Sequence, residues 1–288
     1  MKVMITGSSG QIGKHLTAQL KNTAHNITAL SHQELDITDA NKTHDAMNIY
    51  LPDVVVNLAA YTSVELAENN IRKAFLVNEK GSENIAKESS KINAILIHLS
   101  TDYVFSGKKL SLYKETDTPD PINIYGKSKF AGELAIATHN PRHIILRTSW
   151  VFSDEGENFY KKILKVAEDE SSISVVSDQM GGPTYAGDVA VAIIKMIDKI
   201  KHFLSTDWGV YHYSGEPYVS WLEFAQEIFK IHSNGEHKRL EVMAISSTEY
   251  PSKAKRPANS RLSNQKIVEC LGVEPSNWRR ALKDIRKP

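Results

Sequence analysis

The sequence is poor in cysteine, in long apolar runs and in excess charge of either sign. Cys270 is the only cysteine among 288 residues, so an intrachain disulfide is excluded. No stretch approaches the roughly 18 to 20 apolar residues that span a bilayer, and the apolar run at the start is too short for a signal peptide. The 35 basic and 34 acidic side chains nearly cancel, which gives no support to binding of nucleic acid or of a membrane surface. We expect a soluble, cytoplasmic protein.

Short apolar runs rich in β-branched residues alternate with helix-like stretches through the first half of the chain. Each run is nearly continuous in apolar residues, which is typical of strands buried on both faces. The runs are KVMIT (2–6), NITAL (26–30), DVVVNLA (53–59), AILIHLS (94–100) and HIILRTS (143–149). This alternation predicts an α/β fold with a doubly wound parallel sheet of the Rossmann type.

The rhythm changes after Trp150. Helical periodicity covers residues 158–169, 187–200 and 220–232, with Ser220 as the N-cap of the last helix, and residues 173–177 suit a strand. We predict a large Rossmann domain over residues 1–150, with a contribution from about 184–212. Residues 151–183 and 213–288 are predicted to form a smaller C-terminal lobe.

A glycine-rich turn, ITGSSGQIG, follows the first predicted strand and opens a helix. Glycine allows a tight turn and a close approach of the backbone to a pyrophosphate, and a helix N-terminus offers free N–H donors to the phosphate oxygens. The predicted cofactor-binding residues in this turn are Gly7, Gly10, Gln11, Ile12 and Gly13.

The end of the second predicted strand bears on the choice between NADP and NAD. An acidic residue there would bind the ribose 2′-hydroxyl of NAD, but the sequence has Ser31 and His32. NADPH is therefore expected as the cofactor, with NADH possible. Asp36 and Ile37 follow at a position suited to the adenine, although Asp36 could equally be the N-cap of the next helix.

Three further segments are expected at the carboxyl edge of the sheet, where parallel strands line a ligand crevice. One strand ends at Thr101 and Asp102. Another ends in small residues that leave room for a cofactor, at Ala59, Ala60 and Tyr61. The third segment is the helix that begins with YGKSK.

Tyr125 and Lys129 lie four positions apart and so share one face of that helix. A free tyrosine, with a pKa of about 10, is a poor acid near neutral pH, but a neighbouring ammonium favours the phenolate. With Thr101 to orient a substrate carbonyl, these residues predict carbonyl reduction: hydride from a nicotinamide and a proton from Tyr125.

Several longer strings narrow this prediction. They are NLAA, STDYVFSG, YGKSKFAGE, RTSWVF, DQMGGPT and RPANSRL, spread over residues 3 to about 263. In this order they resemble the dTDP-4-dehydrorhamnose reductase family of the extended short-chain dehydrogenase/reductase superfamily. The resemblance implies NADPH-dependent reduction of the 4-keto group of dTDP-4-dehydro-β-L-rhamnose to dTDP-L-rhamnose, the last step of dTDP-rhamnose biosynthesis.

The resemblance also implies a role for each matching residue. Tyr125 would be the proton donor, and Lys129 its partner on the nicotinamide ribose. Thr101 would tune the tyrosine, and the substrate would be held by Thr101, Asp102, Trp150, Asn158 and Arg256, while Asn78 joins the cofactor-binding set. Without the resemblance, Trp150 would more often be a core residue and Arg256 part of a solvated basic loop.

One departure from the family concerns metal binding. Some members are magnesium-bridged dimers that use a glutamate two residues past the third glycine, and this chain has His15 there. We therefore expect no metal, and a monomer or a weak homodimer.

Rival functions stay open. One is a reductase of a related nucleotide-linked 4-keto-6-deoxyhexose, and another is a non-catalytic NADP-binding regulatory subunit. A 4-epimerase would retain tightly bound NAD. A dehydratase is disfavoured because Tyr103 stands where its catalytic glutamate would be.

Overall fold

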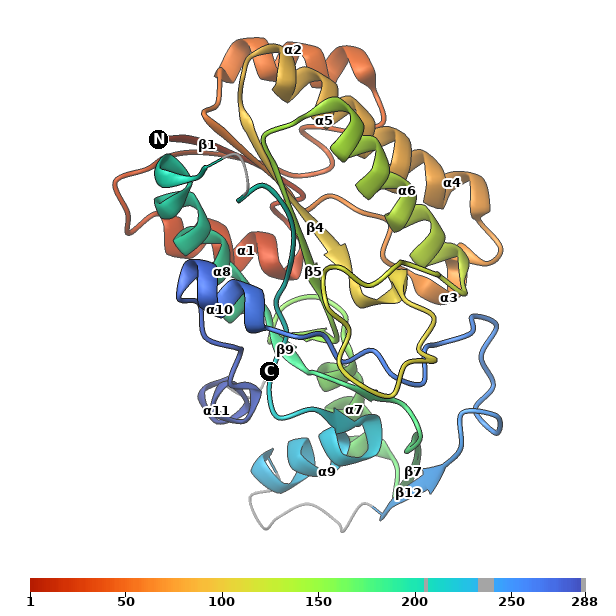
Figure 1. Ribbon diagram of the computed structural model, residues 1–288. Helices are drawn as coiled ribbons and strands as arrows, with labels where there is room; N and C mark the ends of the chain where they lie inside the picture. The colour runs from red at the N-terminus through yellow and green to blue at the C-terminus, as the bar shows by residue number, and fades with distance from the viewer. Residues whose placement is uncertain (205–206, 233–240, 286–288) are drawn as a thin grey trace.

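A six-stranded parallel sheet forms the centre of the computed structural model, which describes residues 1–204, 207–232 and 241–285, with the backbone alone at 167–169 (Figure 1). The spatial order of the strands is β2-β1-β3-β4-β5-β10. Their bounds are β1 (Lys2–Thr6), β2 (Asn26–Leu30), β3 (Val54–Asn57), β4 (Ile95–Thr101), β5 (His143–Thr148) and β10 (Gly209–His212). The predicted fold class and all five predicted strands are confirmed.

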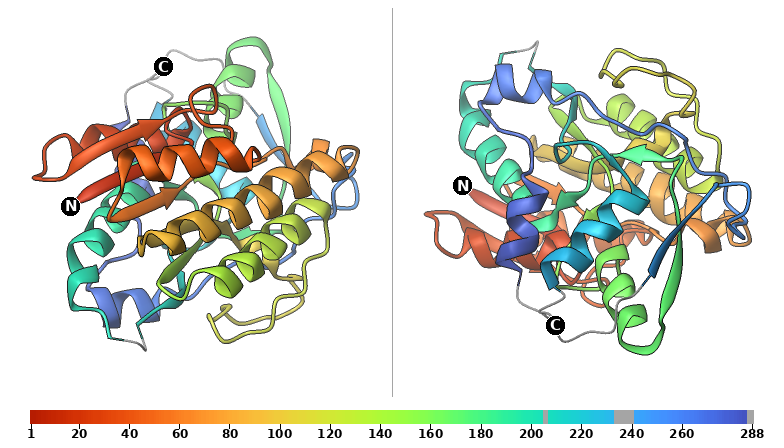
Figure 2. Two further views of the ribbon diagram at one scale, coloured as in Figure 1. Left: turned by 90° about the horizontal axis from the view of Figure 1, so that it is seen from above. Right: turned by 90° about the horizontal axis from the view of Figure 1, so that it is seen from below.

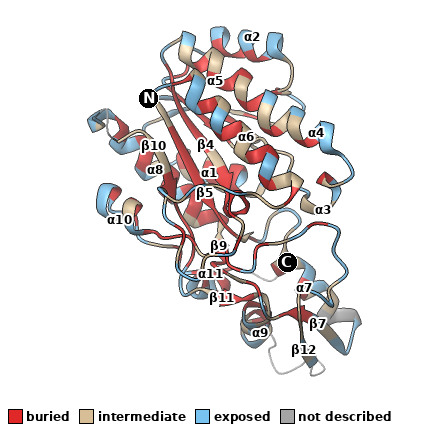
Figure 3. Cartoon of the chain, turned by 45° about the vertical axis from the view of Figure 1, so that its right-hand side comes forward, coloured by how far each residue is buried: buried red, intermediate tan, exposed pale blue. Residues whose placement is uncertain are grey.

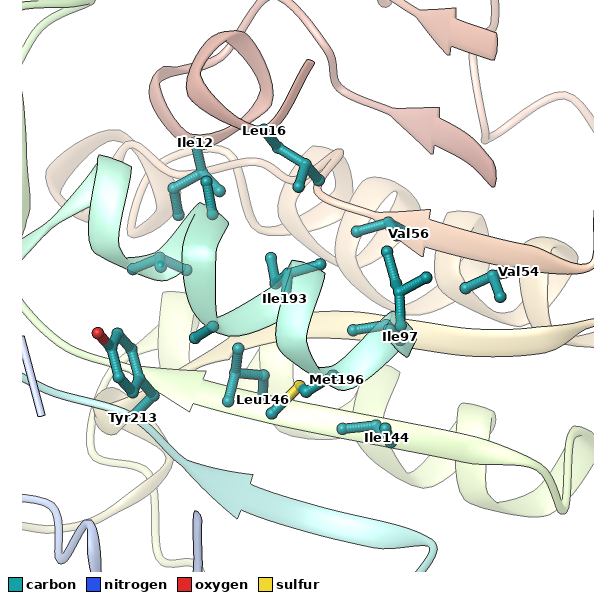
Figure 4. Packing of buried hydrophobic residues seen from close by; sticks show 14 of the residues in the cluster. Ile12, Leu16, Val54, Val56, Ile97, Ile144, Leu146, Ile193, Met196 and Tyr213 are labelled. Carbon is teal, nitrogen blue, oxygen red and sulfur yellow. The ribbon is translucent and has the colours of Figure 1, made fainter. Parts of the chain in front are cut away.

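Successive residues of each strand point to opposite faces of the sheet, and both faces are covered by helices. On one face, α1 (Gln11–Leu20) and α8 (Ala186–Lys199) pack on Val56, Ile97 and Leu146, as Figure 4 shows. On the other face lie α2 (Ala40–Tyr50), α5 (Ser82–Lys91) and α6 (Ile124–His139). Figure 2 shows the two layers from above and below. Strands enclosed in this way need the continuous apolar runs seen in the sequence.

The first turn of α2 shows which aspartate caps this helix. Asp39 caps α2 by accepting hydrogen bonds from the N–H groups of Asn41 and Lys42. The alternative that Asp36 caps this helix is therefore wrong, because its carboxylate accepts from Thr38 instead.

The helix-like stretch expected between the third and fourth strands is present. It consists of α4 (Ile71–Phe75), a π-helical turn η1 (Leu76–Gly81) and α5, which follow one another without a break.

A smaller lobe lies beyond the carboxyl edge of the sheet. Its strands are short and paired: β6 (Val151–Phe152) with β9 (Thr184–Tyr185), β7 (Ser172–Val176) with β12 (Glu241–Ile245), and β8 (Met180–Gly181) with β11 (Val219–Ser220). Its helices are α7 (Phe159–Asp169), α9 (Trp221–His232) and α11 (Trp278–Asp284), while α10 (Gln265–Leu271) packs on the large sheet. Figure 3 shows the lobe below the sheet. Of the predicted lobe, residues 233–240 and 286–288 lie outside the described residues.

Aromatic side chains fill the core of the lobe. Phe152, Tyr160, Phe224 and Trp278 are all fully buried, and Phe224 makes an edge contact with the Trp278 ring at 5.4 Å. The predicted cap of α9 is confirmed: the Ser220 hydroxyl accepts from the Glu223 N–H while the Glu223 carboxylate accepts from the Ser220 N–H. Within the described ranges, no helix combines the length and apolar composition needed to cross a membrane.

Candidate active site

A cleft of about 870 Å³ runs along the carboxyl edge of the sheet and separates it from the lobe. The first helix turn and the ends of β1, β3 and β4 supply one wall. The lobe supplies the other wall through Trp150, Trp221 and residues 156–159. The cleft thus lies where the doubly wound fold places ligands.

The glycine turn brings two backbone segments into direct contact at one end of the cleft. Gly7 has φ of +70°, and a Cβ on it would lie 2.7 Å from the Ala59 nitrogen. A Cβ on Gly13 would lie 2.4 Å from the Gly7 oxygen. No side chain caps the first turn of α1, so its N–H groups are available to an anion. The cradle therefore suits a pyrophosphate.

The end of β2 differs in part from the expectation. His32, Asp36 and Ile37 line the cleft, but Ser31 does not. Sequence reasoning also missed the carboxylate of Glu34 at this position. Glu34 turns back and accepts a hydrogen bond of 2.7 Å from the Ser31 N–H. Hydrogen bonds from Ser31 hold the pKa of Glu34 below its usual value. This turn at the end of β2 is therefore more acidic than the sequence suggested.

Ala59, Ala60 and Tyr61 line the cleft, whereas Asn78 is buried behind it. The Asn78 amide donates to the Tyr61 carbonyl and the Ser128 hydroxyl, and its oxygen accepts from the Tyr61 N–H. Asn78 therefore joins the segment after β3 to helix α6. The structure does not place it in the cleft wall.

Tyr125 stands in the first turn of α6, which Asn123 caps through a hydrogen bond from the Gly126 N–H. Its ring meets Tyr103 edge-on at 5.8 Å. Burial raises the pKa of Tyr125 to about 12; a hydrogen bond with Thr101 lowers it, and the neighbouring Asp102 raises it further. The pKa of Tyr125 is therefore raised, whereas the sequence predicted that the Lys129 ammonium would lower it.

Lys129 is 2% exposed and lies behind the cleft wall rather than in it. Its Nζ donates to the Leu99 carbonyl at 2.6 Å and contacts His98 Nε2 at 3.2 Å. Burial lowers the pKa of Lys129 to about 8, against the opposing influence of Glu133.

Thr101 ends β4 and Asp102 follows it, and both line the cleft together with Tyr125. The Thr101 hydroxyl donates to the Asp102 carboxylate at 2.9 Å. Burial raises the pKa of Asp102 to about 7, although hydrogen bonds from Ser260 and Thr101 lower it. The cleft therefore holds a phenol, a hydroxyl and a carboxyl group close together.

An aromatic wall made by Trp150, Trp221 and Phe159 forms the lobe side of the cleft. The two indoles stack with centroids 3.5 Å apart, and Phe159 lies 4.6 Å from Trp221. Trp150 is half-buried and adopts φ of +47°, while a Cβ on Gly181 would lie 2.3 Å from its ring. Sequence reasoning missed Trp221, for which the only signal was an aromatic residue at the start of a predicted helix.

Asn158 and Arg256 do not come together as a single subsite. The Asn158 amide donates to Gln11 Oε1 at 2.9 Å and its oxygen caps α7, so it joins the lobe to the glycine turn. Arg256 lines an adjoining cavity of about 760 Å³, which shares Tyr103, Phe159 and Trp221 with the cleft. Its guanidinium pairs with Glu65 at 2.5 Å, a partner that sequence reasoning missed.

His15 lies 3.4 Å from the Asp154 carboxylate, beside the Tyr185 ring. Among the residues that the structure describes, no group of three or more histidine, cysteine, aspartate or glutamate side chains is arranged to hold a metal ion.

The family model described as the RmlD substrate binding domain matches residues 1–288. The dTDP-4-dehydrorhamnose reductase of Aggregatibacter actinomycetemcomitans is 44% identical over 99% of this chain and 98% of its own length. That of Sinorhizobium fredii is 40% identical over 96% and 94%. The chain belongs to the dTDP-4-dehydrorhamnose reductase (RmlD) family.

Other relatives and solved structures fit this assignment. The spore coat polysaccharide biosynthesis protein SpsK of Bacillus subtilis is 41% identical over 98% of this chain and 96% of its own. The structure of the dTDP-4-dehydrorhamnose reductase of Bacillus anthracis in complex with NADP superposes with a TM-score of 0.91 at 34% identity, covering 99% of this chain and 98% of that one. The resemblance to this family that the sequence shows is therefore confirmed over the whole length of the chain.

Proposed function

We propose that this protein reduces the 4-keto group of dTDP-4-dehydro-β-L-rhamnose with NADPH and yields dTDP-L-rhamnose. The observation that carries the proposal is the single cleft shared by the glycine turn, Thr101 and Tyr125. This reduction needs at least a dinucleotide site and a proton donor that both reach the carbonyl group of the substrate.

The residues at the cofactor end fit a dinucleotide. The cradle of Gly7 and Gly13 leaves no room for side chains between the turn and the chain after β3. Next to it, the small side chains of Ala59 and Ala60 leave space for the cofactor along the cleft wall. NADPH supplies the hydride when it is bound. The NADP complex of the Bacillus anthracis relative supports this choice over NADH, and Glu34 is the local feature that opposes it.

At the reacting end, Tyr125 donates its proton to the carbonyl oxygen as negative charge develops there. The Thr101 hydroxyl orients that oxygen, and Lys129, behind the wall, acts on the tyrosine and the nicotinamide ribose. The aromatic wall of Trp150 and Trp221 packs on the apolar face of the deoxysugar. Arg256 binds the diphosphate by charge-assisted hydrogen bonds after exchanging its partner Glu65.

We assign the cofactor to residues 1–150 with about 184–212, and the nucleotide sugar to the lobe of residues 151–183 and 213–288. A cytoplasmic monomer or weak homodimer without a metal is the accompanying proposal. The rings of Trp150 and Trp221, which line the lobe side of the cleft, support placing the sugar there.

The test follows NADPH absorbance with the 4-keto sugar nucleotide made in situ from dTDP-glucose. Tyr125→Phe removes the proton donor and is expected to lower kcat by about 10²- to 10⁴-fold. Tyr50→Phe, at an exposed position of α2, is the matched control and should keep full activity. Full activity in Tyr125→Phe would contradict the assigned role.

The same assay separates the rivals. Equal turnover of an isomeric 4-keto-6-deoxyhexose nucleotide would indicate the related reductase, and NADPH binding without turnover of any such sugar would indicate a regulatory subunit.

A further inference from the structure

His98 is a fully buried histidine of β4 whose ring lies between two polar partners. Its Nδ1 is 3.1 Å from the amide nitrogen of Asn57 in β3. Its Nε2 is 3.2 Å from the Nζ of Lys129 in α6. The proposed chemistry does not use this ring.

The orientation of Asn57 decides which ring nitrogen carries the proton. The Asn57 oxygen accepts from the Ala59 N–H at 3.2 Å and from the Thr6 hydroxyl at 2.7 Å. Because a backbone N–H can only donate, the oxygen of the Asn57 amide must face Ala59 and its NH₂ must face the ring. His98 Nδ1 is therefore an acceptor. A neutral imidazole has one acceptor and one donor, so the proton is on Nε2 and points at Lys129.

This proton acts on the charge of Lys129. An ammonium group can only donate, so an Nε2–H facing it opposes it, whereas a neutral amine accepts that hydrogen bond through its lone pair. The hydrogen bond from Lys129 to the Leu99 carbonyl is available to both forms. The ring thus favours the neutral amine over the ammonium.

Other titratable groups around this pair act in known directions. Glu133, one turn further along α6, raises the pKa of Lys129, but its own carboxylate is bound by Arg147 and Ser100. Burial, followed by the charges of Lys129 and His143, holds the pKa of His98 well below its usual value, so the ring stays neutral.

We propose that His98 is a positioning residue of the reductase: held by Asn57, it presents its Nε2–H to Lys129 and sets both the direction and the charge of that amine. The inference rests on the proposed function for its role in the reaction. Its physical core concerns only the ring and its two partners. Burial alone lowers the pKa of Lys129 to about 8, whereas a free lysine stays charged up to about pH 10.

The first test reads the ring directly by NMR with ¹⁵N-labelled histidine, with the His98 signal assigned by its loss in His98→Gln. We expect a protonated Nε2 and a bare Nδ1 between about pH 6 and pH 9. A proton on Nδ1, or a charged ring, overturns the proposal. This readout does not depend on any substrate, so it stands even if the proposed reaction fails.

The second test is the pH profile of kcat/KM. Activity needs the Lys129 ammonium, so it falls as pH rises through the pKa of that lysine. In His98→Gln the side-chain oxygen can face Lys129 and favour the ammonium, which should move this fall upward by about one pH unit. His25→Gln is the matched control: His25 bonds to Asp198 at 3.0 Å, and its variant should leave the profile unchanged.

Asn57→Asp keeps His98 and tests the same step from the other side. An aspartate oxygen in place of the NH₂ requires a proton on His98 Nδ1, which leaves Nε2 to accept from the Lys129 ammonium. The basic limb of the profile should again move upward. An unchanged limb in both variants, with each folded by circular dichroism, overturns the proposal.

Discussion

The two walls of the cleft are built by opposite means. The cofactor end is made of backbone: Gly7 and Gly13 remove side chains so that the chain can approach itself closely. The lobe end is made of side chains, the stacked indoles of Trp150 and Trp221. Backbone cannot be repacked, whereas aromatic rings can shift. On the proposed assignment, one wall can thus stay constant for the cofactor while the other adapts to the sugar.

A methyl group added to the backbone wall should produce the largest effect. In Gly13→Ala the new Cβ would lie 2.4 Å from the Gly7 oxygen. This oxygen belongs to the backbone, so it cannot turn away as a flexible side chain could. We expect the free energy of NADPH binding to weaken by about 3 kcal/mol. Calorimetry should therefore show binding that is more than about 100-fold weaker.

Gly10→Ala is the control for this variant, because its Cβ would meet the same oxygen at 3.4 Å, an ordinary contact. It should melt close to the wild-type temperature, while Gly13→Ala melts well below it. Equal melting temperatures would mean that the backbone wall is not rigid.

Asp102, which stands between the two walls, should produce an intermediate effect. Its raised pKa means that the folded protein holds this proton more tightly than the unfolded chain does, so the carboxyl group makes stability fall as pH rises from about 4 to about 7. Asp102→Asn should remove about 2 kcal/mol of that fall between pH 5 and pH 7. Urea unfolding at both pH values measures this difference, and parallel losses in variant and wild type would refute it.

A methyl group added to the aromatic wall should produce the smallest effect. In Gly181→Ala the Cβ would meet the Trp150 ring at 2.3 Å, and the ring can move at the cost of its stack with Trp221. We expect the free energy of sugar-nucleotide binding to weaken by about 1 kcal/mol. This corresponds to a roughly 5-fold higher KM for the sugar nucleotide, with an unchanged KM for NADPH. A rise in the KM for NADPH alone would reverse the proposed division between the walls.

The same contrast explains what the sequence could predict. The five strands and the glycine turn follow from local patterns, and Thr101, Asp102, Tyr125 and Trp150 do line one cleft. Strand β10 was not predicted, because its four residues acquire their role only by pairing with β5.

The missed features have a common physical cause. Trp221, Glu65 and His98 act through partners that lie 31 to 191 positions away: His98 contacts Lys129, Trp221 stacks on Trp150, and Glu65 pairs with Arg256. Local periodicity carries no record of such pairs. Ser31 and Asn78 show the converse, since both occupy positions expected of the cofactor site yet use their polar groups to bind the protein itself.

The return of the chain to the large sheet has a consequence for protein engineering. After β5 the chain builds part of the lobe, comes back as α8 and β10, and leaves again for α9. A single cut therefore yields no complete half: a fragment ending at Trp150 lacks an outer strand, β10, and also α8, one of the two helices that cover one face of the sheet. If the sugar binds to the lobe as proposed, exchanging sugar specificity between relatives requires two separate segments to be transplanted together, with junctions that spare α8 and β10.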